Sequence, residues 1–133
     1  MVDFRKHIDT EIKSKAVPML RAAGFRGSFP HFRRPSPRGI DLITFQFDRH
    51  GGGFVVEIAC APASGITTHW GKFIEPTKIT AWDIHPNERW RLGSTLGGDF
   101  WFRYDDGNVV SCVSKFMELW SSAELWWSQH AVA

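Results

Sequence analysis

The sequence lacks acidic residues over a long stretch near its start. Between Ile12 and Ile40 there is no aspartate or glutamate, whereas seven lysines and arginines occur there. Residues 1–40 carry nine basic and three acidic side chains, a net charge of +6, while residues 41–133 carry seven and eleven, a net charge of −4. Charge segregated in this way favours an acidic protein partner or a nucleic-acid backbone, although arginines can also simply solvate the edge of a sheet.

Long apolar runs are absent as well. No run approaches the ~20 apolar residues that a membrane-crossing helix needs, and residues 1–5 are too polar to begin a signal peptide. The only two cysteines, Cys60 and Cys112, stand in apolar runs, where a thiol packs as a small hydrophobic group. We therefore expect a cytoplasmic protein with free thiols and no membrane contact.

Signatures of catalysis and of metal or cofactor binding are missing too. The six histidines are scattered, with no His-x-x-x-His, His-x-His or Cys-x-x-Cys spacing, so only an assembly in three dimensions, such as His69 with Asp83 and His85, could bind a metal. Residues 51–53 are three glycines that precede a strand pattern rather than a helix, so they cannot hold a phosphate at a helix N-terminus. We expect no metal, no cofactor and no catalytic residue.

The pattern of apolar residues predicts the fold. A length of 133 residues predicts one domain, 1–133. Apolar residues at spacings of three and four predict a first helix over 4–23, kinked by Pro18 and ended by Gly24, and a last helix over 109–127. Strands with alternating side chains are expected at 28–34, 40–48, 54–60, 88–93 and 99–104. We predict the α+β class, with an antiparallel sheet of about five strands and the N- and C-terminal helices packed on one of its faces.

One candidate surface follows from the acid-free stretch. Arginines and phenylalanines are interleaved there, namely Arg26, Phe29, Phe32, Arg33, Arg34 and Arg38. The arginines could contact phosphates while the phenylalanines stack on bases, as in proteins that bind single-stranded nucleic acids with a sheet. The same surface could instead receive an acidic protein partner.

A second candidate surface is the sheet face that the helices leave open. Alternation places Arg89 and Arg91 on one side of their strand, and Gln46 and Glu57 lie near the middles of two strands joined by a glycine-rich hairpin. We predict one ligand-binding patch with aromatic residues at its rim, made of Gln46, Glu57, Arg89, Arg91 and Arg103 with Trp70 or Trp82. The alternatives are an ordinary solvated sheet face with Arg–Glu pairs, or acid–base chemistry by a buried Glu57. If the patch binds a ligand, replacing Arg91 by alanine should abolish binding with little change in melting temperature.

Several short motifs occur together in a particular order. Ala22-Ala23-Gly24-Phe25 ends the first helix, Phe45-Gln46 and Phe54-Val55-Val56-Glu57-Ile58 lie in strands, and Asp83-Ile84-His85, Glu88-Arg89-Trp90-Arg91-Leu92-Gly93 and Asp99-Phe100-Trp101 follow. This order resembles the bacterial DUF4304 family of unknown function over nearly the whole chain. Ile84 stands where the family has a cysteine, and Phe102 stands where it has a second tryptophan, so no role of that cysteine transfers. The resemblance supports the fold and implies no reaction.

These observations favour a non-enzymatic binding protein. A protein partner is preferred, and an immunity-type protein that blocks a toxin fits this class by analogy. A single-stranded nucleic-acid-binding domain, a small-anion-binding domain and an enzyme that uses the polar sheet face stay open as alternatives. Nothing in the sequence indicates an oligomeric state.

Overall fold

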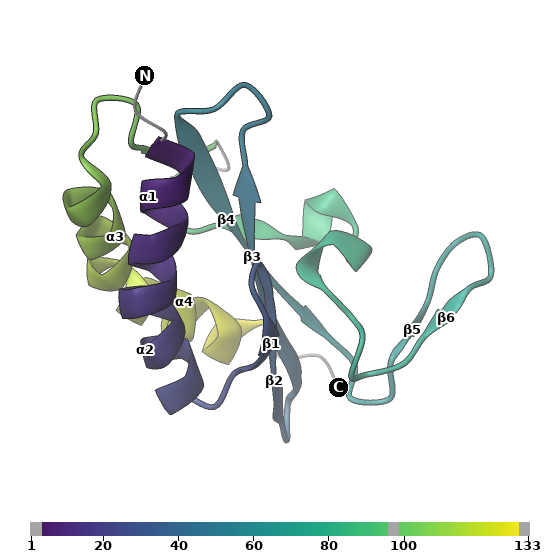
Figure 1. Ribbon diagram of the computed structural model, residues 1–133. Coiled ribbons are helices and arrows are strands. Elements are labelled where there is room, and N and C mark those ends of the chain that lie inside the picture. Colours follow the sequence, from purple (N-terminus) through teal and green to yellow (C-terminus); the bar gives the residue numbers. More distant parts are fainter. Residues whose placement is uncertain (1–3, 96–98, 131–133) are drawn as a thin grey trace.

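The protein is built from a layer of helices and an antiparallel sheet, with irregular segments on the far side of the sheet (Figure 1). The computed structural model describes residues 4–95 and 99–130. The helices of both chain ends lie on the same side of the sheet, which confirms the predicted α+β class and the packing of both helical segments on one face.

The N-terminal helical segment is divided by a wider turn. It consists of α1 (Phe4–Glu11), a π-helical turn (Ile12–Ala16) and α2 (Val17–Ala22). Pro18 has no N–H to donate, and the preceding Val17 N–H donates five residues back to the carbonyl of Ile12, so the predicted kink takes the form of this π-turn. Gly24 ends α2 with a positive φ of 101°, and the Phe25 N–H returns to the carbonyl of Leu20 at 2.9 Å.

The main sheet has the order β1-β2-β3-β4-β7, and β8 also pairs with β4. Every pairing is antiparallel, as predicted. The bounds are β1 (Arg26–Ser28), β2 (His31–Ser36), β3 (Gly39–Phe47), β4 (Gly53–Ala61), β7 (Trp90–Arg91) and β8 (Phe102–Arg103). The long central pair β3–β4 matches the expected strands to within one residue at each end, because the period-two alternation there is unbroken.

The other strands differ from the expectation. The predicted strand over 28–34 is split into β1 and β2 by the turn at Phe29-Pro30, and the two predicted late strands shrink to the two-residue β7 and β8. The excursion 61–86 contains a hairpin of its own, β5 (Ile66–Thr67) with β6 (Phe73–Ile74), and two short 3₁₀ turns at Ala81–Asp83 and Pro86–Glu88 follow. This hairpin projects away from the sheet (Figure 1).

The C-terminal helical segment is likewise two helices instead of one. α3 (Val109–Glu118) and α4 (Trp120–Gln129) meet at Leu119. The larger hydrophobic core lies between the helices and the sheet and contains Trp127, Phe25, Phe45 and Phe116, which are almost fully buried. Phe116 and Trp127 belong to the apolar stripe that predicted the last helix, and Phe45 lies in a predicted strand.

A second, smaller core lies on the opposite face of the sheet. Ile79, Ala81 and Ile84 from the excursion pack there on the starts and ends of the central strands, at Ile40, Leu42, Ala59 and Ala61. The excursion therefore covers one half of this face, and the half nearer Gln46 and Glu57 stays open.

Cys60 and Cys112 are both free thiols, as the sequence analysis expected. Burial raises the pKa of the Cys112 thiol to about 11, and Asp106 adds to this effect. Among residues 4–95 and 99–130, no helix combines the length and apolar character that crossing a membrane requires.

Candidate functional site

The register of three strands aligns polar side chains on the open half of the sheet. Glu57 on β4 lies opposite Thr44 on β3 and opposite Arg91 on β7. Because residues two apart in a strand share a face, Gln46 lies on the same side as Thr44. The antiparallel register thus brings Gln46, Glu57 and Arg91 to one side of the sheet.

These residues line a cavity of about 360 Å³. Its walls come from β3, β4, β7 and the segments on either side of β7, and the lining residues are Gln46, Glu57, Pro86, Arg89, Trp90, Arg91, Ser94 and Asp99. Four of the seven residues predicted for the patch are therefore brought together in one cavity.

Arg91 is held in the wall of this cavity by two carboxylates. Its Nε donates to Glu57 Oε1 at 3.0 Å, and its Nη1 lies 3.0 Å from Asp99 Oδ1. The Glu57 side chain is only 4% exposed, so its charge depends on Arg91 for compensation. This pairing revises the expectation that Arg91 could be replaced without loss of stability.

Arg89 is positioned differently, by backbone carbonyls. Its Nε donates to the carbonyl of Ile84 at 2.7 Å, and its Nη2 donates to the carbonyl of Trp82 at 3.0 Å. Within the described part of the chain it forms no ion pair with a carboxylate, and Nη1 takes part in neither of these bonds. Arg89 therefore brings a fixed positive charge to the cavity that no acidic side chain of the described residues neutralises.

Trp82 lies beside the cavity and is 47% exposed. Its Nε1 donates to Gln46 Oε1 at 3.2 Å, and its ring packs edge-on against the ring of His31 at 4.7 Å. The excursion thus folds Trp82, one of the two predicted rim residues, onto the open face. Burial lowers the pKa of His31, and the nearby Arg33 lowers it further, against a smaller opposing effect of Asp83.

The remaining patch residues lie elsewhere. Trp70 is on the projecting hairpin, where it is 67% exposed, and it does not line the cavity. Arg103 on β8 pairs with Gly53 at the far end of β4, where its guanidinium stacks on Trp101 at 4.9 Å and lies 3.8 Å from Asp48. Arg103 shares the sheet face but is outside the cavity.

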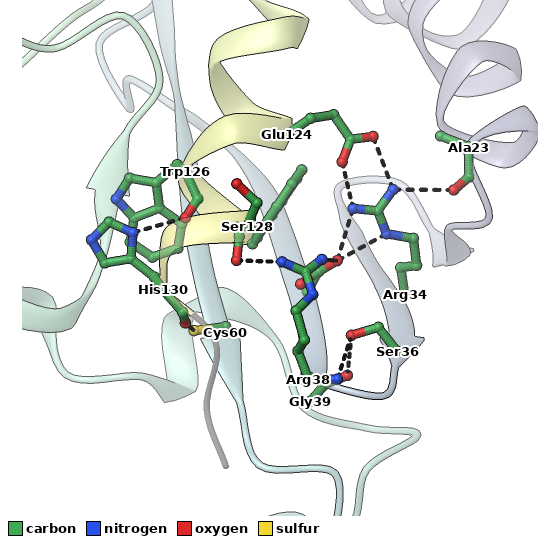
Figure 2. Close-up of polar contacts among 12 residues, drawn as sticks. Ala23, Arg34, Ser36, Arg38, Gly39, Cys60, Glu124, Trp126, Ser128 and His130 are labelled. Atoms are coloured by element: carbon green, nitrogen blue, oxygen red, sulfur yellow. Dashed lines mark hydrogen bonds and ion pairs between the residues drawn. The ribbon is translucent and has the colours of Figure 1, made fainter.

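The predicted basic surface is not one surface. Figure 2 shows Arg34 pointing toward Glu124 of α4 and the carbonyl of Ala23, with Arg38 close by. Arg34 Nε donates to Asp41 at 2.9 Å and its two Nη atoms donate to Glu124 at 2.9 and 2.6 Å, while Arg38 donates to the carbonyl of Trp127 at 2.8 Å. Both arginines are thus bonded to the helix layer.

The other members of that surface lie apart from these two. Arg26 and Arg33 are cross-strand partners that line a pocket on the opposite side of the sheet. Phe29 packs on Phe45 and Phe47 at the edge of the larger core. Because neighbouring residues of a strand face opposite ways, Arg33 and Arg34 cannot share a surface. The nucleic-acid hypothesis therefore loses its geometric support.

Sequence reasoning missed several residues of the cavity. Trp90 borders the cavity, but it pairs with Ile58 across β4 and its ring stacks on Trp126 of α4, so its side chain lies on the helix side, opposite Arg91. Asp99 carries no local signal, since its pairing with Arg91 depends on tertiary structure. Among the described residues, no group of three His, Cys, Asp or Glu side chains is placed to hold a metal ion.

Comparison with known proteins gives one result. The model of a family described as a domain of unknown function, DUF4304, matches residues 16–130. No curated protein and no solved structure was matched.

Proposed function

Since the chain belongs to the DUF4304 family of unknown function, we propose that it is a non-enzymatic binding protein whose open sheet face receives an acidic side chain of a protein partner. Arg89 is the residue that pairs with the partner's carboxylate. The observation that carries the proposal is that two backbone carbonyls fix Arg89 in the cavity, while both acidic side chains of the cavity are paired with Arg91.

The balance of charge in the cavity favours a single carboxylate as the ligand. Two arginines and two acidic residues line it, and Arg91 is already paired with both Glu57 and Asp99. Only the charge of Arg89 is left to neutralise, which suits one aspartate or glutamate better than a phosphate with its higher charge. A guanidinium whose orientation is fixed in advance also loses less entropy on binding.

The residues around Arg89 support a protein partner over a free anion. Tryptophan and arginine dominate the energetic centres of protein interfaces. Trp82, whose carbonyl accepts a hydrogen bond from Arg89, is half-exposed. Trp70 and Phe73 on the projecting hairpin add exposed aromatic surface, 67% and 58% exposed. A free anion bound at Arg89 would not contact these exposed aromatic side chains.

Glu57 has a supporting role in this proposal. It is buried and bonded to Arg91, so it fixes the cavity wall and does not meet a substrate as an acid or base. We also infer a cytoplasmic location, where the two free thiols would stay reduced. An immunity-type role remains an analogy within this class.

Replacing Gln46 by glutamate should weaken capture of the partner by at least about tenfold, because like charges placed together at an interface cost several kcal/mol. The change is nearly isosteric, and the new carboxylate can still accept the bond from Trp82 Nε1. Capture by immobilised protein, quantified against wild type, measures the effect. The matched control is Gln129→Glu, which adds the same charge on exposed α4.

A second pair of variants removes charge instead of adding it. Arg89→Gln should also abolish capture, whereas Arg49→Gln in the exposed hairpin turn should leave it unchanged. Capture that is equal for wild type, Gln46→Glu and Arg89→Gln would show that this face does not bind the partner. If the purified protein instead bound free glutamate with the same affinity as the captured protein partner, the cavity would be a binding site for a small anion.

A further inference from the structure

A second pocket lies on the same side of the sheet, at the other end of β3. It has a volume of about 240 Å³ and is formed by the β1–β2 edge, the start of β3 and the segments on either side of the β5–β6 hairpin. Its lining residues are Arg26, Arg33, Pro35, Ile40, Ala63, Pro76 and Thr77. Ile40 opens β3 and Gln46 lies near its end, so this pocket and the cavity of Arg89 are separate.

The interior of this pocket is apolar. Ile40 is almost fully buried, and the rings of Pro35 and Pro76 with the methyl group of Ala63 supply most of the other walls. Rings and short side chains of this kind have little freedom to rearrange, so the pocket keeps its shape. A volume below the ~300–1,000 Å³ of pockets for drug-sized ligands limits its occupant to a small molecule.

Two guanidinium groups accompany this apolar interior. Arg26 and Arg33 are directly opposite each other across the β1–β2 pair, which places both on one face. Arg33 Nε donates to the carbonyl of Ile79 at 2.9 Å, which ties the arginine to the excursion. Among residues 4–95 and 99–130, neither guanidinium lies within ion-pair distance of a carboxylate.

Two like charges opposite each other on a sheet destabilise it unless something compensates them. Burial lowers the pKa of Arg33, and the charge of Asp83 offsets only part of this effect. An anion between the two guanidinium groups would remove the repulsion and gain charge-assisted hydrogen bonds from both.

We propose that this pocket binds a small monocarboxylic acid with an apolar body, its carboxylate between Arg26 and Arg33 and its hydrocarbon part against Ile40, Pro35 and Pro76. The apolar walls distinguish this ligand from inorganic phosphate or sulfate, which would leave them without contact. This site is independent of the partner-binding face around Arg89.

Hexanoate is a suitable probe, because its carboxylate and its short alkyl chain test both halves of the pocket. Titration of isotope-labelled protein should give saturable changes in the amide signals of Ala63 and Thr77. Hexanamide, which lacks the charge, and acetate, which lacks the chain, should each bind at least about tenfold more weakly. Equal affinity for hexanoate and hexanamide would overturn the proposal, as would shifts that do not saturate.

Variants test the two halves separately. Arg26→Gln removes one charge from an exposed position and should weaken hexanoate binding by about tenfold. Arg49→Gln is the matched control and should bind as wild type. Ala63→Leu keeps both arginines but fills the pocket, so it should abolish binding. Because Ala63 is exposed, the larger side chain should not disturb the fold. Hexanoate affinity that is unchanged in both Arg26→Gln and Ala63→Leu would rule this pocket out.

Discussion

Replacing Arg34 by methionine should lower the free energy of unfolding by about 3–5 kcal/mol, the usual loss when one partner of a buried ion pair is removed. The Arg34 side chain is 16% exposed and that of Asp41 is 4% exposed, so methionine would leave the Asp41 carboxylate buried and without its main partner. The same guanidinium also bonds Glu124 and the carbonyl of Ala23, and it stacks on Phe25 at 4.6 Å. One side chain thus joins β2, β3, α4 and the end of α2.

Urea denaturation of purified variants measures this effect. Arg34→Lys keeps the charge but loses the fork of parallel bonds, so it should fall between wild type and Arg34→Met. Arg26→Met, in the neighbouring strand but on the opposite face, should change stability by no more than about 0.5 kcal/mol. A loss below about 1 kcal/mol for Arg34→Met would mean that the ion pairs with Asp41 and Glu124 do not hold the helices to the sheet.

The second large effect is expected at Arg91. Its replacement by methionine should cost about 2–4 kcal/mol of unfolding free energy, because Glu57 would become a buried carboxylate without compensation. The value is placed below that for Arg34 because the Arg91 side chain is 25% exposed and water can reach part of the site. Loss of ligand binding in this variant would therefore not identify Arg91 as a binding residue.

A double variant separates the pair from the cavity around it. Glu57→Met together with Arg91→Met removes both charges, and apolar residues of similar size often replace a buried ion pair without loss. The double variant should thus recover most of the stability that Arg91→Met loses. If the double variant is no more stable than Arg91→Met alone, the cost does not come from an uncompensated Glu57.

The fold was predictable where a periodic pattern of apolar residues extends over a long segment. The helical stripes and the alternation over β3 and β4 predicted the layers and the central strands, because each buries a regular face. The hairpin β5–β6 was not found, and the strands that contain β7 and β8 were predicted too long, since two-residue strands show no period. Pro18 predicted the kink that takes the form of the π-turn, whereas the spacing of apolar residues gave no sign of the break at Leu119.

The candidate site was predictable in part for the same reason. The sequence predicted Gln46, Glu57 and Arg91 in one patch, but alternation within a strand does not fix the register between strands. The register of β3, β4 and β7 brings these residues into one cavity. The grouping of Arg33 with Arg34 overlooked this rule, because adjacent residues of a strand point to opposite faces. The positions of Trp82 and Asp99 depend on tertiary structure that no local pattern encodes.

The central claim is that a partner binds the open sheet face at Trp82 and Arg89. Its most direct test is photo-crosslinking in cells that produce the protein with p-benzoylphenylalanine in place of Trp82, an exchange of one large exposed aromatic group for another. The control position is Leu125 on α4, which is 57% exposed on the helix layer. Adducts are identified by mass spectrometry of the linked peptides.

The account predicts one protein adduct from position 82, with an aspartate or glutamate near the linked site of the partner. That adduct should disappear when Arg89→Gln is added and should not form from position 125. No adduct from position 82, or the same adduct from both positions, would contradict the claim that this face binds a partner.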